Sequence, residues 1–243
     1  MGVRRLNYLT DDPWNPDHRC RWFFDALLAY DRLFSVRRSN LEDLAKHGCR
    51  SVEYLPFGFD PDLFYPAGRD GLEKMDGPPL DVVFAGGADR DRVPYLKALI
   101  KAGFRVGLYG AYWDRYPETR NHTLGYATPA TLRGVFGSAK VTLCLVRRSN
   151  RDGNSMRTFE APAAGACVLA EETQEHREIF GQEGDAARFF KTPEEAVEKT
   201  RVLLANEADR LRMAKRSFEK ITQGRHTYQD RLSAMLGGSS EGS

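Results

Sequence analysis

Short apolar runs alternate with amphipathic stretches along most of the chain, and this alternation is typical of a parallel sheet flanked by helices. In the first 58 residues, the apolar runs predict strands at 4–9, 31–36 and 51–55, and the stretches between them predict helices at 19–29 and 39–47. Ser39 and Glu42 have the spacing of a capping box, and Gly48 is a typical helix stop. We therefore expect residues 1–58 to form a partial, βαβαβ, Rossmann-like segment.

A second alternating series follows a stretch of different composition. Residues 56–80 contain five prolines and few periodic apolar positions, so we predict a linker at 59–80. Beyond it we expect strands at 81–85, 104–109, 140–146, 166–170 and 186–190, with helices at 91–102, 128–137, 155–164, 174–180, 193–205, 207–222 and 228–236. The predicted fold class is α/β, with a doubly wound parallel sheet over 81–236 and a disordered polar tail at 237–243.

Composition excludes several classes of function. The 243 residues include 36 basic and 34 acidic side chains, and the net charge of +2 creates no overall field for nucleic acid or an anionic membrane. No apolar run reaches the roughly 20 residues of a membrane span, and the N-terminus lacks the apolar core of a secretory signal. Four cysteines without C-x-x-C spacing indicate free thiols in a reducing compartment, so we expect a cytoplasmic protein.

The first candidate for chemistry is the turn at Gly86 and Gly87, where an apolar strand ends and a helix is expected to begin. Glycines let the backbone approach a ligand closely, and the N-terminus of the following helix favours a diphosphate. Arg90 and Arg92 add cations beside this turn. The alternative is a plain glycine turn without a ligand.

The second candidate is the segment 147–160, which follows a strand and opens a helix with four arginines and two carboxylates. Arg157 lies in the first turn of that helix, where a cation opposes the helix dipole, so an anionic ligand or a carboxylate partner is needed to explain it. Glu160, one turn further, has two oxygens for a ribose diol. Pro162 is expected to bend the helix. The alternative is a solvated charged loop.

Two further groups lie at the ends of predicted strands. Tyr109, Gly110 and Trp113 follow one strand, where aromatic rings wall a base or sugar pocket, and ordinary packing is the alternative. Asp11 and Asp12 follow another, where paired carboxylates serve as an acid/base pair or bind sugar hydroxyls. For this pair, an Asp-Asp-Pro turn without function is the alternative.

In their order and spacing, segments along nearly the whole chain resemble the group-1 glycosyltransferases, and most closely the spore-maturation CgeB-like branch. The segments are 30–34 (YDRLF), Gly48, 55–58 (LPFG), 60–61 (DP), 64–66 (FYP), 83–87 (VFAGG) with a following arginine, 109–110 (YG) with Trp113, 157–161 (RTFEA), 164–165 (AG), and 226–228 (HTY) with Arg231. Asp152 and Glu160 have the separation of the acidic pair in the family signature, with Asp in place of the usual first Glu.

The resemblance implies a GT-B architecture of two Rossmann-like domains. It also implies transfer of a sugar from a UDP- or GDP-sugar to an acceptor that the sequence does not identify, with retention of configuration. Glu160 would bind the donor ribose, and Asp152 would lie near the donor sugar or phosphate. Arg90, Arg92 and Arg157 would take the place of the usual Arg–Lys pair on the diphosphate, so neither a metal nor another cofactor is expected.

The implied site has a donor side and a catalytic side. The donor side comprises Gly86, Gly87, Arg90, Arg92, Tyr109, Gly110, Trp113, Arg157 and Glu160. The catalytic side comprises Asp11 and Asp12, which would lie across the cleft near the acceptor, together with Asp152 and Arg157.

Members of this family normally begin with a complete N-terminal domain, much of which has no counterpart in this sequence. The sequence is therefore a fragment, a chain whose partner supplies the rest, or a reduced form. The exposed edge of a truncated sheet favours association, as a homo-oligomer or with a partner chain. A non-catalytic nucleotide-sugar-binding or partner-binding module is the alternative to an enzyme. A dinucleotide-dependent oxidoreductase is disfavoured, because no G-x-G-x-x-G follows a predicted strand.

Overall fold

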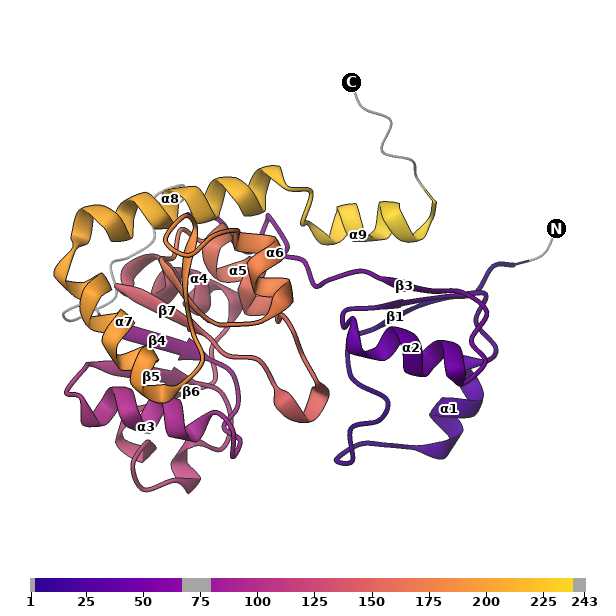
Figure 1. Cartoon of the computed structure of the whole chain (residues 1–243), viewed down its shortest axis with the longest axis horizontal. Helices are drawn as coiled ribbons and strands as arrows, with labels where there is room; N and C mark the ends of the chain where they lie inside the picture. Colours follow the sequence, from indigo (N-terminus) through magenta and orange to yellow (C-terminus); the bar gives the residue numbers. More distant parts are fainter. Residues whose placement is uncertain (1–2, 67–79, 238–243) are drawn as a thin grey trace.

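The computed structural model describes residues 3–66 and 80–237. Two parallel sheets organise this part of the chain, one of three strands and one of six (Figure 1). We call residues 3–55 the N-terminal unit and residues 80–223 the C-terminal unit. The predicted α/β class with parallel sheets is confirmed.

The N-terminal unit is a βαβαβ fold, as predicted. Its strands pair in parallel in the order β1-β2-β3, with Leu6 opposite Arg32. The elements are β1 (Leu6–Leu9), α1 (Arg21–Leu27), β2 (Arg32–Ser35), α2 (Ser39–Lys46) and β3 (Val52–Tyr54). Apolar side chains of both helices pack on the sheet and leave Leu27, Leu33 and Leu44 without exposed surface.

The predicted capping box of α2 is wrong. Arg38 occupies the N-cap position without a capping side chain, and the Ser39 hydroxyl donates instead to the backbone oxygen of Arg151 in the C-terminal unit (3.1 Å). The Ser39 side chain, which the local sequence predicts as the helix cap, therefore forms a contact between the two units. The predicted end of α2 is confirmed, since His47 is the C-cap and Gly48 follows with a φ of +99°.

The C-terminal unit is built on six parallel strands in the order β6-β5-β4-β7-β8-β9. The strands are β4 (Val82–Ala85), β5 (Val106–Tyr109), β6 (Thr123–Gly125), β7 (Val141–Cys144), β8 (Val168–Glu171) and β9 (Ala187–Phe190). The helices are α3 (Val93–Lys101), α4 (Pro129–Ser138), α5 (Met156–Ala163), α6 (Gln174–Phe180), α7 (Pro193–Ala205) and α8 (Glu207–Gln223), with short 3-10 helices at Trp113–Arg115, Arg120–His122 and Arg148–Asn150. The sequence predicts five of these strands but not β6, whose three residues contain no apolar run.

Helices cover both faces of the large sheet. Val82 and Phe84 of β4 pack in one apolar cluster with side chains of α3 and α7, whereas Val83 and Ala85 pack in another with side chains of α4 and α5. Every residue of β4, β7 and β8 is buried. This double covering explains why these strands are continuous apolar runs rather than alternating patterns.

The last helix, α9 (Tyr228–Met235), brings the chain back to the N-terminal unit (Figure 1). Arg231 donates to the backbone oxygens of Pro56 and Phe57, both at 2.8 Å, and Phe59 pairs with Thr227 in a short parallel bridge. The segment after β3 and the start of α9 are thus joined. Of the predicted linker and tail, residues 67–79 and 238–243 lie outside the described residues.

Candidate functional site

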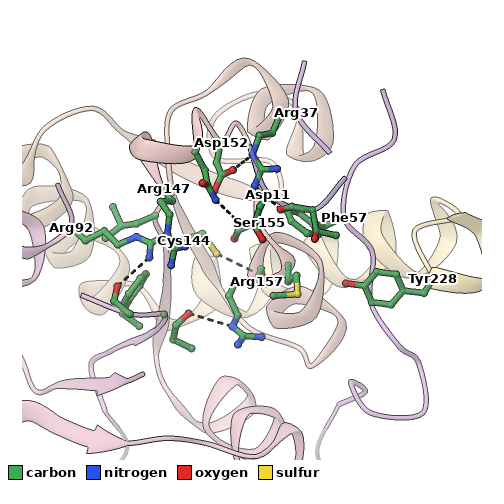
Figure 2. Close-up of a pocket in the computed structure, with 18 residues that line it drawn as sticks. Asp11, Arg37, Phe57, Arg92, Cys144, Arg147, Asp152, Ser155, Arg157 and Tyr228 are labelled. Atoms are coloured by element: carbon green, nitrogen blue, oxygen red, sulfur yellow. Dashed lines mark hydrogen bonds and ion pairs between the residues drawn. The ribbon is translucent and has the colours of Figure 1, made fainter. Parts of the chain in front are cut away.

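The strand order creates a switch point between β4 and β7. The chain leaves β4 towards β5 and β6 on one side and then crosses back to β7 on the other, so the loops after β4 and β7 diverge and leave a crevice in which doubly wound folds bind ligands. A cavity of about 340 Å³, which we call the first pocket, opens there (Figure 2). Its polar and charged lining consists of Thr10, Asp11, Arg37, Arg92, Arg147, Asn150, Asp152, Ser155, Arg157 and Tyr228.

A second cavity of about 340 Å³, the second pocket, adjoins the first. The two share Ala85, Gly86, Gly87, Arg147 and Arg157. The rest of the second pocket is lined by Ala88, Tyr109, Gly110, Ala111, Tyr112, Tyr126, Ala127 and Leu132. Tyr112 and Tyr126 are exposed, with exposed fractions of 51% and 84%, and the guanidinium of Arg115 lies over the Tyr112 ring, 4.0 Å from its centroid. The two cavities together offer an aromatic side, a cationic middle and a polar side.

The wall between the pockets is the turn at Gly86 and Gly87. Gly110 packs against this turn with a φ of +127°, and a Cβ at Gly110 would lie 2.5 Å from the Gly86 oxygen. Trp113 is fully buried and donates its indole N–H to the same oxygen (2.8 Å), but it lines neither pocket. Trp113 therefore supports the turn from behind, as the packing alternative expects. Tyr109 lines the second pocket.

The two arginines beside this turn have different environments. Arg92 lines the first pocket, donates to the backbone oxygens of Gly87 (3.1 Å) and Val146 (3.3 Å), and lies 3.4 Å from the carboxylate of Asp89. It therefore ties the loop after β4 to the loop after β7. Arg90 is exposed and lines neither pocket, so the structure does not bring it to the site.

The loop after β7 is held by the N-terminal unit. Arg151 contacts Asp12 twice, at 2.6 and 3.0 Å, and Asp43 once, at 2.6 Å. Asn150 donates to the carboxylate of Asp11 (3.1 Å). Part of the polar character of this loop is therefore explained by contacts between the two units and not by a ligand.

The other three arginines of the segment 147–160 differ in how they are paired. Arg148 pairs with Glu171 at 2.9 Å and lines neither pocket. Arg157 pairs with Glu160, one turn along α5. Arg147 lines both pockets, and its side chain has no hydrogen bond or ion pair with any residue of the ranges 3–66 and 80–237. Among the described arginines of this segment, Arg147 is thus the one without a partner, and it lies at the junction of the pockets.

The three aspartates expected on the catalytic side are spread over the crevice. Asp11 is exposed and lines the first pocket. Asp152 also lines it but is paired with the buried guanidinium of Arg37, and burial raises the pKa of Asp152 while Arg37 opposes that rise. Asp12 is only 1% exposed and lies outside the first pocket, in the wall of an adjacent cavity of about 260 Å³.

A chain of hydrogen bonds fixes the start of α5, where Ser155 is the N-cap. The Ser155 N–H donates to Thr158 Oγ1 (3.0 Å), Thr158 Oγ1 lies 3.0 Å from His176 Nε2, and His176 Nδ1 lies 2.6 Å from the Glu171 backbone oxygen. Since a carbonyl oxygen only accepts, Nδ1 carries the proton and Nε2 accepts from the threonine hydroxyl. Burial lowers the pKa of His176 to about 4, which keeps the imidazole neutral.

Glu160 lies behind Arg157 and is not part of the lining of either pocket. Burial raises the pKa of Glu160, and the attraction of Arg157 opposes that rise. Arg157 also donates to the backbone oxygen of Ala85 (3.3 Å), so it links α5 to the end of β4. Pro162 lies inside α5 without ending it, because the helix continues to Ala163.

Cys20, Cys49, Cys144 and Cys167 are all free thiols. Within the described residues, no three His, Cys, Asp or Glu side chains gather as a metal site would require. Over the same ranges, none of the helices has the length and apolar character needed to cross a membrane.

A family model described as glycosyl transferase-like matches residues 92–237, which is more than half of the sequence. The chain belongs to this family. The matched range includes Arg92, Arg147, Arg157 and α9, and it ends at the last described residue. Among curated proteins, none matches this glycosyl transferase-like chain.

Several solved structures share the fold of this chain. Sucrose-phosphate synthase from Thermosynechococcus elongatus is 15% identical, with a TM-score of 0.63 over 96% of this chain and 66% of its own. TarM from S. aureus, in complex with UDP, is 10% identical, with a TM-score of 0.68 over 96% of this chain and 50% of its own. Anabaena HepE, in complex with UDP-glucose, is 12% identical, with a TM-score of 0.66 over 96% and 72%. The chain thus spans only half to three-quarters of these proteins.

Arg147, Arg37 and Tyr228 are among the residues of the first pocket to which the sequence assigned no individual role, although Arg147 belongs to the candidate segment 147–160. Arg147 directly follows an apolar strand, so its position at the sheet edge was a usable signal. Arg37 follows β2 in the same way, but nothing in the sequence shows that the N-terminal unit faces this pocket. Tyr228 lies in the C-terminal segment and reaches the pocket because α9 folds back, with its hydroxyl turned towards the cavity (Figure 2).

Proposed function

We propose that this glycosyl transferase-like chain binds a nucleoside diphosphate sugar across the two pockets and takes part in transfer of the sugar to an acceptor. The observation that carries the proposal is the shared wall, in which Gly86, Gly87, Arg147 and Arg157 lie between an aromatic cavity and a polar one. The ligand has the same order of chemistry, with a planar base, two phosphates and a ring of hydroxyls. The CgeB-like branch stays our assignment from the sequence segments.

The base fits the second pocket. Tyr126 is exposed in the lining of this pocket, and Tyr112 lines it with a ring over which the Arg115 guanidinium is stacked. Among the described residues, the lining of this pocket contains no carboxylate to accept from the amino and imino groups of guanine. This lining, together with the UDP and UDP-glucose held by TarM and HepE, favours a uridine donor.

The diphosphate fits the cationic middle. Arg147 is available to bind a phosphate, and charge-assisted hydrogen bonds from a guanidinium are among the strongest that a protein offers. Arg157 adds a second cation that Glu160 holds in place. Glu160 lies outside the lining of both pockets, and its role at the ribose rests on the resemblance: one of its two oxygens retains Arg157, and the other would accept from a ribose hydroxyl. Stabilising the leaving diphosphate in this way requires no metal.

The sugar fits the polar side of the first pocket, near Asp11 and Asp152. In the transfer, the bond between the anomeric carbon and the distal phosphate oxygen breaks, the acceptor hydroxyl oxygen forms the new bond to that carbon, and the hydroxyl proton passes to the leaving diphosphate. We assign Asp11 to the acceptor side because it is exposed, and we assign Asp12 to positioning because its carboxylate is held by Arg151. Retention of configuration follows from the resemblance to group-1 enzymes.

Calorimetric titration of UDP, GDP, UDP-glucose and GDP-mannose into the wild-type protein tests the donor site. The proposal expects binding that prefers uridine ligands and that weakens in Glu160→Ala. Incubation of radiolabelled UDP-glucose, with and without candidate acceptors, then tests turnover. Absence of binding by all four ligands would sink the proposed site.

One observation favours a non-catalytic nucleotide-sugar-binding function as the second candidate. The carboxylates that reach the first pocket are engaged, since Asp11 accepts from Asn150 and Asp152 from Arg37. Donor binding with neither sugar transfer nor slow hydrolysis of the donor would support this candidate. Release of free sugar from the donor would support the enzyme.

A further inference from the structure

Arg37 brings a buried cation from the N-terminal unit into the first pocket. It lies in the turn between β2 and α2, and only 2% of the residue is exposed. Its Nε donates to Asp152 and its Nη2 donates to the Thr10 backbone oxygen (2.8 Å). Figure 2 shows its guanidinium beside Asp152 at the edge of the cavity.

The third nitrogen of this guanidinium is unsatisfied. Nη1 of Arg37 has no hydrogen-bond acceptor among the described residues, although it is buried. Buried donors without an acceptor cost free energy and are rare in folded proteins, so each one requires an explanation. A role in joining the two units does not explain the unsatisfied donor. The units are already joined outside the first pocket, by the ion pairs of Arg38 with Glu178 and of Arg151 with Asp12.

Arg37 lies at one end of the combined cavity. The residues shared with the second pocket are those of the Gly86 turn, Arg147 and Arg157, and Arg37 is not among them. Its neighbours in the first pocket are Thr10, Asp11 and Asp152. In the orientation of the proposed function, this end receives the sugar and not the nucleotide.

Arg37 and Asp152 form a matched pair for a sugar hydroxyl. A hydroxyl both donates and accepts, and this pair offers an N–H donor beside a carboxylate acceptor. The guanidinium also opposes the rise that burial causes in the pKa of Asp152, and so favours the ionised acceptor.

We propose that Arg37 donates from Nη1 to a hydroxyl oxygen of the donor sugar, so that the N-terminal unit makes the pocket selective for the nucleotide sugar over the free nucleotide. This inference rests on the proposed function. It assigns to the N-terminal unit a direct part in recognition of the sugar, in addition to its hold on the loop after β7.

The test compares Arg37→Lys with Arg38→Lys. Both variants keep the charge in the same turn, but Arg38 is exposed, pairs with Glu178 and does not line the first pocket. Calorimetry gives the dissociation constants of UDP and UDP-glucose for each protein. We expect Arg37→Lys to lose about tenfold or more in affinity for UDP-glucose, with a change in UDP affinity of less than about threefold, and Arg38→Lys to match the wild type.

Equal losses for UDP and UDP-glucose in Arg37→Lys, or no loss for either, would overturn the inference while leaving the proposed function intact. Failure of the wild type to bind either ligand would remove both. If Arg37→Lys does not fold, the double variant Arg37→Gln, Asp152→Asn replaces it, because removing both charges leaves no buried ion unpaired. In that variant, preserved preference for UDP-glucose over UDP would equally overturn the inference.

Discussion

Arg151 and Asp12, which are 139 positions apart in the sequence, form an ion pair with two contacts between the two units, Nε to Oδ2 at 2.6 Å and Nη2 to Oδ1 at 3.0 Å. Each residue is a candidate for binding chemistry when the sequence is considered alone, and each is largely accounted for by the other in the structure. The pair fixes the middle of a loop whose neighbours, Asn150 and Asp152, line the first pocket. The ion pair therefore matters for function because it positions that loop.

Replacing Asp12 with Asn should destabilise the protein. Asp12 is buried while the Arg151 side chain is 39% exposed, so solvent screens part of the interaction, and we expect the free energy of unfolding to fall by about 1–2 kcal/mol. Urea denaturation followed by circular dichroism measures the change. Asp17→Asn is the matched control, because Asp17 lies in the same segment but is exposed. Equal stability of the two variants would contradict a structural role for Asp12.

Removing Arg147 should weaken ligand binding with little effect on folding. Its side chain has no partner among the described residues, whereas a phosphate would receive charge-assisted hydrogen bonds from it. Loss of such bonds corresponds to about a 10- to 100-fold weaker affinity for UDP in Arg147→Ala. Calorimetry measures this loss, and thermal unfolding should show a midpoint close to that of the wild type.

Arg148→Ala is the control for this variant. Arg148 is adjacent in sequence and pairs with Glu171 outside both pockets, so its loss should leave UDP affinity within about threefold of the wild type. A comparable loss of affinity in the two variants would mean that only the general positive charge of the loop matters.

The charged loop that contains these two arginines shows what the sequence alone does not determine. Alternation of apolar runs suffices for the βαβαβ segment and for five strands of the large sheet, because buried parallel strands are apolar on both faces. Residues after such strands are correctly expected at one sheet edge. Sequence does not show which side chains of a charged loop pair with another unit, because those pairs join positions more than a hundred residues apart.

Tertiary packing also decides the roles of Trp113 and Arg90. An indole after a strand fits a ligand wall and a buried support equally well in sequence, and only the hydrogen bond to the Gly86 oxygen distinguishes them. Arg90 lies two positions before Arg92, yet the two side chains differ completely in burial because the chain turns into α3 between them. The short strand β6 is not predicted either. It forms because it pairs with β5, and its own residues carry no strand pattern.

Acidification should destabilise the protein through His176. Its pKa is about 4 in the folded protein and about 6.5 when the chain is unfolded, so the unfolded state binds more protons as the pH falls through this window. The stability is present above pH 6.5 and is lost as the pH falls towards 4. Between pH 7 and pH 5, the titration of His176 lowers the free energy of unfolding by about 2 kcal/mol. A protonated Nε2 also no longer accepts the hydrogen bond from the Thr158 hydroxyl, and this loss loosens the start of α5.

Comparing wild type with His176→Gln isolates this contribution. His226, whose pKa burial also lowers to about 4, adds to the pH dependence of both proteins and cancels in the difference. Urea denaturation at several pH values should show a clearly smaller loss of stability on acidification in the variant. Parallel curves for the two proteins would show that His176 titrates normally.

Gly110 should be the most sensitive glycine of the site. An added Cβ would lie 2.5 Å from the Gly86 oxygen and 3.0 Å from the Gly87 nitrogen, so the turn that separates the two pockets has to move. Gly103→Ala is the control, because Gly103 also has a positive φ, of +85°, but a Cβ there meets nothing within 4 Å. Backbone strain alone costs Gly103→Ala about 1 kcal/mol, and the added clash should cost Gly110→Ala about 3 kcal/mol, as measured by urea denaturation. At temperatures where both variants are folded, only Gly110→Ala should lose affinity for UDP, because it displaces the backbone against which the diphosphate is proposed to bind. Normal UDP affinity in a folded Gly110→Ala would place the diphosphate elsewhere.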